Sequence, residues 1–297
     1  MKLTGTRAAA GLLAAFLFQA PMVAQAQAKG QKPENARLER GRYLMGAVAA
    51  CGNCHTPRGP DGATLREQEF AGGPPVKEPP FDAYPSNITP HKEAGVGKWT
   101  DAQLRKAIRE GIRPDGSLIG PPMPFTFYRD IADDDLNAII AYMKQVKPSD
   151  AKPPKSVYRI PLPPAYGPAI KAPVKAPSPK DTVAYGGYLA GPLGHCMECH
   201  TPMVKGQVDK SKLGAGGFAF NGPWGTSVAR NLTPHESGLK NWTDAEIEKA
   251  IREGVSRDGS KLKPPMAFEY YKNISAADMK AIIAYLRSLK PLPTGGV

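Results

Sequence analysis

All four cysteines of the chain lie in two five-residue segments, Cys51-Gly52-Asn53-Cys54-His55 and Cys196-Met197-Glu198-Cys199-His200. Two cysteines three positions apart, followed at once by a histidine, form the attachment pattern of a c-type haem. The thiols bond to the two vinyl groups of one porphyrin, and the histidine becomes the proximal ligand of the iron. A disulfide framework would need no histidine after each pair. The pattern therefore predicts two covalently bound haem c groups, attached through Cys51, Cys54, Cys196 and Cys199 and ligated by His55 and His200.

Two matched methionines are candidates for the sixth iron ligand. Met123 and Met266 lie 68 and 66 residues after their histidines, each directly after two prolines. A loop stiffened by proline presents a thioether with little ordering cost, and a neutral sulfur ligand favours Fe(II) and raises the reduction potential. Alternatively, each methionine only fills a gap in the core. The repeated Pro-Pro-Met favours ligation by both.

Other aromatic and imidazole side chains suggest roles at the haem edge. Trp99 and Trp242 each precede a helix start, and their indole N–H groups are candidates to donate to a haem propionate, although core packing explains them equally well. His91 and His235 repeat within Thr-Pro-His. We expect them near the haem edge, because ligation by them would leave Pro-Pro-Met unexplained. His195 has no counterpart, and we expect it to be exposed.

Similar segments recur along the chain at an offset that drifts only from 145 to 143 residues. The haem motifs, Asn87–His91 with Asn231–His235, and the two Pro-Pro-Met segments all follow it. A solenoid would need more and shorter repeats. The sequence therefore predicts two copies of one domain, over residues 29–147 and 181–297.

Between the copies, residues 148–180 form a linker that contains ten prolines. Proline lacks an amide donor and fixes φ, so we expect no regular structure here and a polyproline-like spacer instead. The sequence leaves open whether this spacer is free or packs across both domains.

Each domain shows three helices and no strand with clear alternation. The middle helix starts with a capping box, Thr100–Gln103 or Thr243–Glu246, and Gly111 and Gly254 fit its C-terminal caps. The fold class is therefore all-α, with each small domain wrapped on one haem that supplies apolar surface. Gly41 and Gly186 should let the first helix approach the last one closely. The expected first helix of the N-terminal copy is Glu34–Ala50, and the expected last helices are 133–147 and 276–290.

The first 28 residues have the features of a secretory signal peptide. Lys2 and Arg7 precede the apolar run Ala8–Ala20, and A-x-A cleavage sites end at Ala26 and Ala28. An uncleaved membrane anchor is disfavoured, because the run is short for a spanning helix. No later segment is long and apolar enough to span a bilayer. We expect a periplasmic protein, soluble or peripheral on the inner membrane.

The formal net charge of +12 falls to +10 when Lys2 and Arg7 are removed with the signal peptide. The basic residues are spread along both copies without an Arg-rich arm, which argues against nucleic-acid binding. Such a surface steers encounter with an acidic patch on a redox partner or with anionic lipid. Solubility alone explains most individual lysines equally well.

Each domain resembles class I cytochrome c in its C-x-x-C-H motif, downstream methionine and Gly-bearing first helix that crosses the last. A more specific run is similar to the cytochrome c subunits of membrane-bound bacterial dehydrogenases for alcohols, aldehydes and gluconate. This resemblance implies an electron conduit from a dehydrogenase toward quinone or a terminal oxidase. Those subunits typically carry three haems, whereas this chain has two haem motifs. The run consists of Asn87-Ile-Thr-Pro, Trp99-Thr-Asp, Arg109-Glu-Gly, Asp115-Gly and Pro121-Pro-Met.

Three functions are compatible with this pattern, and electron transfer by two six-coordinate irons leads them. The alternative is a dihaem redox enzyme, such as a peroxidase or a thiosulfate-oxidising cytochrome. A peroxidase needs a displaceable sixth ligand and an acid/base residue over that face, and the two Pro-Pro-Met segments argue against the first requirement. A membrane-docking adaptor would still carry haem and therefore supplements the leading function.

Overall fold

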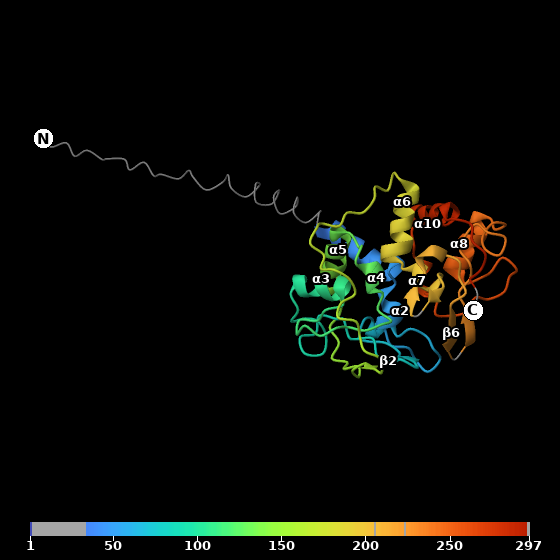
Figure 1. Cartoon of the computed structure of the whole chain (residues 1–297). Helices are drawn as coiled ribbons and strands as arrows, with labels where there is room; N and C mark the ends of the chain where they lie inside the picture. Colours follow the sequence, from blue (N-terminus) through green and yellow to red (C-terminus); the bar gives the residue numbers. More distant parts are fainter. Residues whose placement is uncertain (2–33, 205, 223, 296–297) are drawn as a thin grey trace.

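The computed structural model describes residue 1 and residues 34–204, 206–222 and 224–295. Apart from Met1, the expected signal peptide over residues 1–28 lies outside this range. Among the described residues, no helix combines the length and apolar character that crossing a bilayer requires. An N-terminal half (residues 34–147) and a C-terminal half (residues 181–295) lie side by side (Figure 1).

The same order of helices occurs in both halves. In the N-terminal half these are residues 34–43, η1 (Leu44–Val48), α2 (Cys51–His55), α3 (Asp101–Glu110), α4 (Phe125–Tyr128) and α5 (Asp133–Met143). In the C-terminal half they are α6 (Thr182–Tyr188), η3 (Leu189–Leu193), α7 (Cys196–Cys199), α8 (Asp244–Glu253), α9 (Phe268–Tyr271) and α10 (Ala276–Ser288). Short 3₁₀ turns, η2 (Arg66–Gln68) and η4 (Lys210–Lys212), follow the haem motifs.

The middle helices begin and end where the sequence predicts. The Thr100 hydroxyl accepts from the Gln103 amide, and Thr243 does the same for Glu246, so that both capping boxes are complete. Gly111 and Gly254 end the helices in the left-handed conformation, which costs glycine little.

The first helix of each half crosses the last one at very short range. A Cβ added at Gly41 would lie 2.0 Å from the Ala138 carbonyl oxygen, and one at Gly186 would lie 1.9 Å from that of Ala281. The close approach expected of both glycines is therefore confirmed. The first helix continues from residue 43 as the π-helical segment η1, and α5 and α10 end earlier than expected, at Met143 and Ser288.

The described residues are mostly helical, as the sequence predicts, and they also contain seven short strands that it does not predict. Strands of two to four residues are too short for an alternation of apolar and polar residues to show in the sequence, because side chains alternate between the two faces with a period of two residues. Three of them form an antiparallel sheet in the order β1-β2-β3, and the others form two hairpins. They are β1 (Val76–Glu78), β2 (Phe81–Ala83), β3 (Val157–Tyr158), β4 (Met203–Val204), β5 (Gln207–Val208), β6 (Ala219–Gly222) and β7 (Gly225–Val228).

Strand β3 lies in the linker and contradicts the expectation that residues 148–180 lack regular structure. Residues 155–160 contain no proline, so that their amides remain available for pairing with β2. Further along, the Val174 carbonyl accepts from the Asp133 amide at 2.9 Å. The linker therefore packs along the N-terminal half.

The two halves meet through reciprocal hydrogen bonds. The Tyr43 hydroxyl donates to Asp278 at 2.6 Å and accepts from the Ser275 amide. At the symmetric position, Tyr188 donates to Asp135 at 2.7 Å and accepts from the amide of residue 132. Matched contacts made in both directions are the mark of an approximate two-fold interface.

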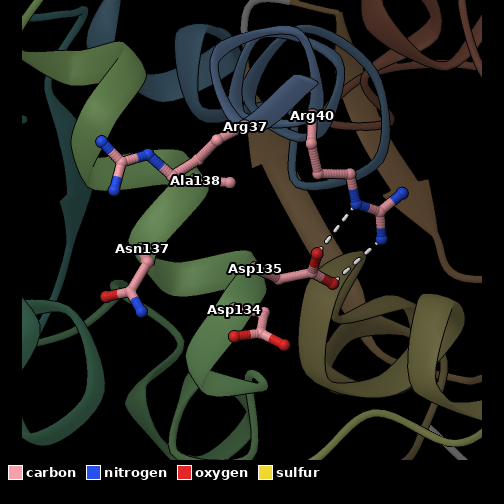
Figure 2. A pocket seen from close by; sticks show the side chains of 6 residues that line it. All are labelled: Arg37, Arg40, Asp134, Asp135, Asn137 and Ala138. Carbon is pink, nitrogen blue, oxygen red and sulfur yellow. Dashed lines mark hydrogen bonds and ion pairs between the residues drawn. The ribbon is translucent and has the colours of Figure 1, made fainter. Parts of the chain in front are cut away.

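The core continues across this interface. One cluster of buried apolar side chains includes Leu44 and Leu136 of the N-terminal half and Leu189 and Ile282 of the C-terminal half. Asp135, at the edge of the cluster, also receives two hydrogen bonds from the Arg40 guanidinium, at 2.8 and 2.9 Å (Figure 2). The halves therefore form one packed body with paired charges at its seam.

Candidate functional sites at the two C-x-x-C-H motifs

Each C-x-x-C-H motif follows a residue in the left-handed conformation. Ala50 has φ 47° before α2, and His195 has φ 38° before α7. This conformation costs a non-glycine residue roughly 1–3 kcal/mol and persists only where the surrounding fold imposes it. Its presence at the same step of both halves shows that the fold directs the chain into each motif in the same way.

The two histidines of these motifs are held in the same way. His55 Nδ1 lies 2.7 Å from the Ser86 carbonyl oxygen, and His200 Nδ1 lies 2.7 Å from that of Arg230. A proton on Nδ1 donated to this carbonyl leaves the lone pair of Nε2 free for a metal. Burial lowers the pKa of both imidazoles, which favours the neutral form that binds iron.

All four cysteines are free thiols. Burial raises the pKa of Cys51 to about 12, with a smaller effect of Cys54 beside it, and raises that of Cys196 to about 11. The raised pKa values favour the protonated thiols at neutral pH. None of the four cysteines forms a disulfide. Two free thiols and one imidazole with an open Nε2 in each motif fit the attachment of one haem c.

The two motifs lie near one another at the interface between the halves. Burial raises the pKa of Cys199, and Glu198, Cys196 and Cys54 of the opposite motif add to the effect. The ring of Tyr128 stands edge-on to the His195 ring of the other half, with centroids 5.7 Å apart. The two motifs are therefore neighbours across the interface, with Cys54 exposed and Cys199 half-buried.

Met123 and Met266 occupy equivalent half-buried positions. The Met123 carbonyl accepts from the Phe125 amide at 2.9 Å, and that of Met266 accepts from Phe268 at 3.1 Å. The peptide bond between the two prolines that precede each methionine is cis. Ligation of iron by these two sulfurs stays a prediction.

Trp99 and Trp242 are half-buried and pack against the main core cluster. Within the described chain, no protein acceptor receives either indole N–H, so that donation to a propionate stays a prediction. His91 Nδ1 accepts from the Ala94 amide at 3.0 Å, and His235 Nδ1 accepts from Ser237 at 3.1 Å. Both imidazoles thus close a local turn.

His195 is not exposed as expected. Only 26% of its side chain is accessible, and its Nδ1 lies 3.2 Å from Glu198 Oε2. The reason is the N-terminal half of the molecule, whose Tyr128 ring packs edge-on against the His195 ring. The sequence of the C-terminal half does not by itself indicate this contact with the N-terminal half.

Two asparagines close local turns and also bind a segment that lies farther along the chain. Asn87 Oδ1 accepts from the Thr89 amide, and its Nδ2 donates to the Ser149 carbonyl at 2.8 Å. Asn231 repeats the turn with Thr233 and donates to Leu292 at 2.7 Å. Each therefore ties the segment after the last helix to its half. Their signal in the sequence is a polar residue repeated before Thr-Pro.

Comparison with known proteins agrees with this chemistry. The family model "Cytochrome c" matches residues 190–290. The chain is 32% identical over 289 residues to the cytochrome c subunit of a quinone alcohol dehydrogenase from Gluconobacter oxydans, covering 90% of the chain and 58% of that subunit. It is 34% identical over 268 residues to the fructose dehydrogenase cytochrome subunit of Gluconobacter japonicus, covering 85% and 52%.

A third relative is matched along most of its length. The dihaem c-type cytochrome of Cereibacter sphaeroides is 30% identical over 263 residues, which cover 84% of each chain. The chain thus spans little more than half of the two dehydrogenase subunits but nearly all of this relative.

Proposed function

This chain belongs to the cytochrome c family, and from that premise we propose that it transfers electrons and carries two haem c groups, one on each half. The proposed domains are residues 29–147 and 181–297. The observation that carries the proposal is the matched donor set, a carbonyl-bound histidine beside two free thiols, which occurs twice. The proposed ligand sets are Cys51, Cys54, His55 and Met123 for the N-terminal haem and Cys196, Cys199, His200 and Met266 for the C-terminal haem.

A bound haem supplies one-electron Fe(III)/Fe(II) chemistry. The residues of this chain would set the reduction potential of each iron. The carbonyls of Ser86 and Arg230 orient the imidazoles and raise their basicity through the Nδ1 proton. The sulfurs of Met123 and Met266 would stabilise the reduced state as ligands, and the apolar cluster continues across the surface where the halves meet.

The arrangement of the halves supports transfer of an electron within the molecule. The reciprocal Tyr–Asp bonds join the two halves, and the Tyr128 ring of one half packs edge-on against the His195 ring of the other, directly before the second motif. The two proposed haem sites would then lie close together in one packed molecule.

We further propose that the protein works in the periplasm, after removal of residues 1–28, and that it accepts electrons from a membrane-bound dehydrogenase. The acceptor is then quinone or a terminal oxidase. The names of two relatives as dehydrogenase cytochrome subunits support a dehydrogenase donor. The net charge of +12 over the whole chain supports steering toward acidic partners and peripheral contact with anionic lipid.

A carbon monoxide titration of the reduced, haem-loaded protein tests the proposed ligation. We expect no spectral change at either haem, because both sixth positions are occupied by sulfur. The variants Met123→Ala and Met266→Ala provide the controls, and each should bind one equivalent of carbon monoxide. Stoichiometric binding to the unmodified protein at one haem would contradict the proposal and favour a dihaem enzyme with an open iron.

A further inference from the structure

The linker supports the loop that carries Met123. The Tyr158 hydroxyl of β3 donates to the Pro121 carbonyl oxygen at 3.0 Å, two residues before the methionine. Its ring lies against Gly120, where an added Cβ would approach within 2.3 Å of the ring. Strand β3 is itself fixed, because the Arg159 amide donates to Pro80 at 2.8 Å. The N-terminal side of the loop therefore rests on a strand from outside the repeated unit.

A second tyrosine of the linker covers the other side of the same loop. The Tyr166 ring stacks on Phe125, with centroids 4.8 Å apart and planes at 29°. Phe125 is 1% exposed, two residues after Met123. The Tyr166 ring also lies 2.9 Å from a Cβ built on Gly111. Met123 thus lies between Pro121, which accepts a hydrogen bond from the linker, and Phe125, on which a ring of the linker stacks.

The C-terminal half supports Met266 differently. Lys263 stands where Gly120 stands in the N-terminal half, and it is exposed, as are the two prolines that follow it. Phe268 is only half-buried, and within the described residues no aromatic ring stacks on it. The contacts here come from polar side chains of the N-terminal half: Asn53 Nδ2 donates to the Pro265 carbonyl at 3.4 Å, and the Thr64 hydroxyl donates to Glu269 at 2.7 Å.

We propose that Tyr158 and Tyr166 are positioning residues that hold Met123 on its iron more firmly than Met266 is held on its own. The proposal rests on the ligation proposed above. A hydrogen bond and a buried stack on either side restrict the motion that would withdraw the sulfur, and they keep water from the loop. A sulfur held in this way is replaced slowly and favours Fe(II). The N-terminal haem is then the one whose sixth ligand is harder to displace.

The test compares Tyr166→Ala, Tyr158→Phe and the conservative variant Tyr166→Phe in the reduced, haem-loaded full chain. Tyr166→Ala removes the stack, and we expect the affinity of the N-terminal haem for carbon monoxide to rise about tenfold, which corresponds to ~1.4 kcal/mol. Tyr158→Phe removes only one hydrogen bond and should give a smaller rise at the same haem. Tyr166→Phe keeps the stacked ring and should restore the closed site.

Met123→Ala and Met266→Ala identify the two haems in these spectra, and the long-wavelength charge-transfer band of sulfur-ligated ferric haem reports the same loss independently. If Tyr166→Ala and Tyr158→Phe leave both haems closed, or open both equally, the positioning role is wrong. If Tyr166→Ala fails to take up haem, Tyr158→Phe alone decides, because it removes a single oxygen. Carbon monoxide binding to both haems of the unmodified protein would instead refute the proposed ligation itself.

Discussion

At the residue scale, the sequence predicts the side chains of each motif but not what holds them. Two thiols and a histidine are specific residue types at a specific spacing, and the structure shows them as free donors. The acceptors for His55 and His200 are the backbone carbonyls of Ser86 and Arg230. Any residue supplies a carbonyl, so no pattern in the sequence identifies them.

Replacing Met266 tests its role as a ligand at this scale. We expect Met266→Ala to lower the potential of the C-terminal haem by about 0.1 V, because loss of a neutral sulfur ligand destabilises Fe(II) within the ~0.8 V range that axial ligands cover. Spectroelectrochemical titration measures the change. Met203→Ala, at an exposed methionine, is the control. An unchanged potential in Met266→Ala would mean that the side chain only fills space.

At the scale of elements, helices were predictable and strands were not. Capping boxes and glycine caps mark α3 and α8 within a few neighbouring residues. The strands have two to four residues and pair with segments far along the chain, as β3 does with β2. Proline content predicted a spacer without regular structure over 148–180, whereas β3 forms there, because its pairing depends on β2 of the folded N-terminal half.

The crossing of the first and last helices provides a prediction for stability. Gly41→Ala places a methyl group 2.0 Å from a backbone oxygen of α5, and we expect a loss of about 1–3 kcal/mol in the free energy of unfolding from overpacking. Urea denaturation measures it. The matched control is Gly46→Ala, where an added Cβ meets nothing within 4 Å. Equal stability of the two variants would show that the helices separate without cost.

At the scale of the whole molecule, the halves depend on contacts that the repeat alone does not reveal. Tyr43 and Tyr188 are visible in the sequence as matched residues, but the partner of Tyr43 is Asp278, 235 positions away. The offset between copies predicts that two domains exist. The offset does not indicate which surfaces the domains share, because the sequence of one domain does not distinguish residues at the interface from residues exposed to solvent.

We expect the interface between the halves to lose stability at alkaline pH. Burial and the bond donated to Asp278 raise the pKa of Tyr43 to about 12 from 10.0, so that the folded state favours the protonated phenol. Its contribution is complete below pH 10 and is lost as the pH rises toward about 12. The midpoint of urea denaturation should fall as the pH rises across this window. In the Tyr43→Phe variant, the midpoint should fall less steeply with pH. Identical slopes would exclude Tyr43 as the titrating group.

Gly52 has a consequence for which surfaces pair. A Cβ at this position would lie 2.4 Å from the Tyr270 hydroxyl of the other half, and the C-terminal half has Met197 at the equivalent position. Two C-terminal halves meeting through the same surface would set Met197 against a second Tyr270, so that one of these side chains would have to move. The glycine therefore favours the pairing of the N-terminal half with the C-terminal half over the pairing of two C-terminal halves.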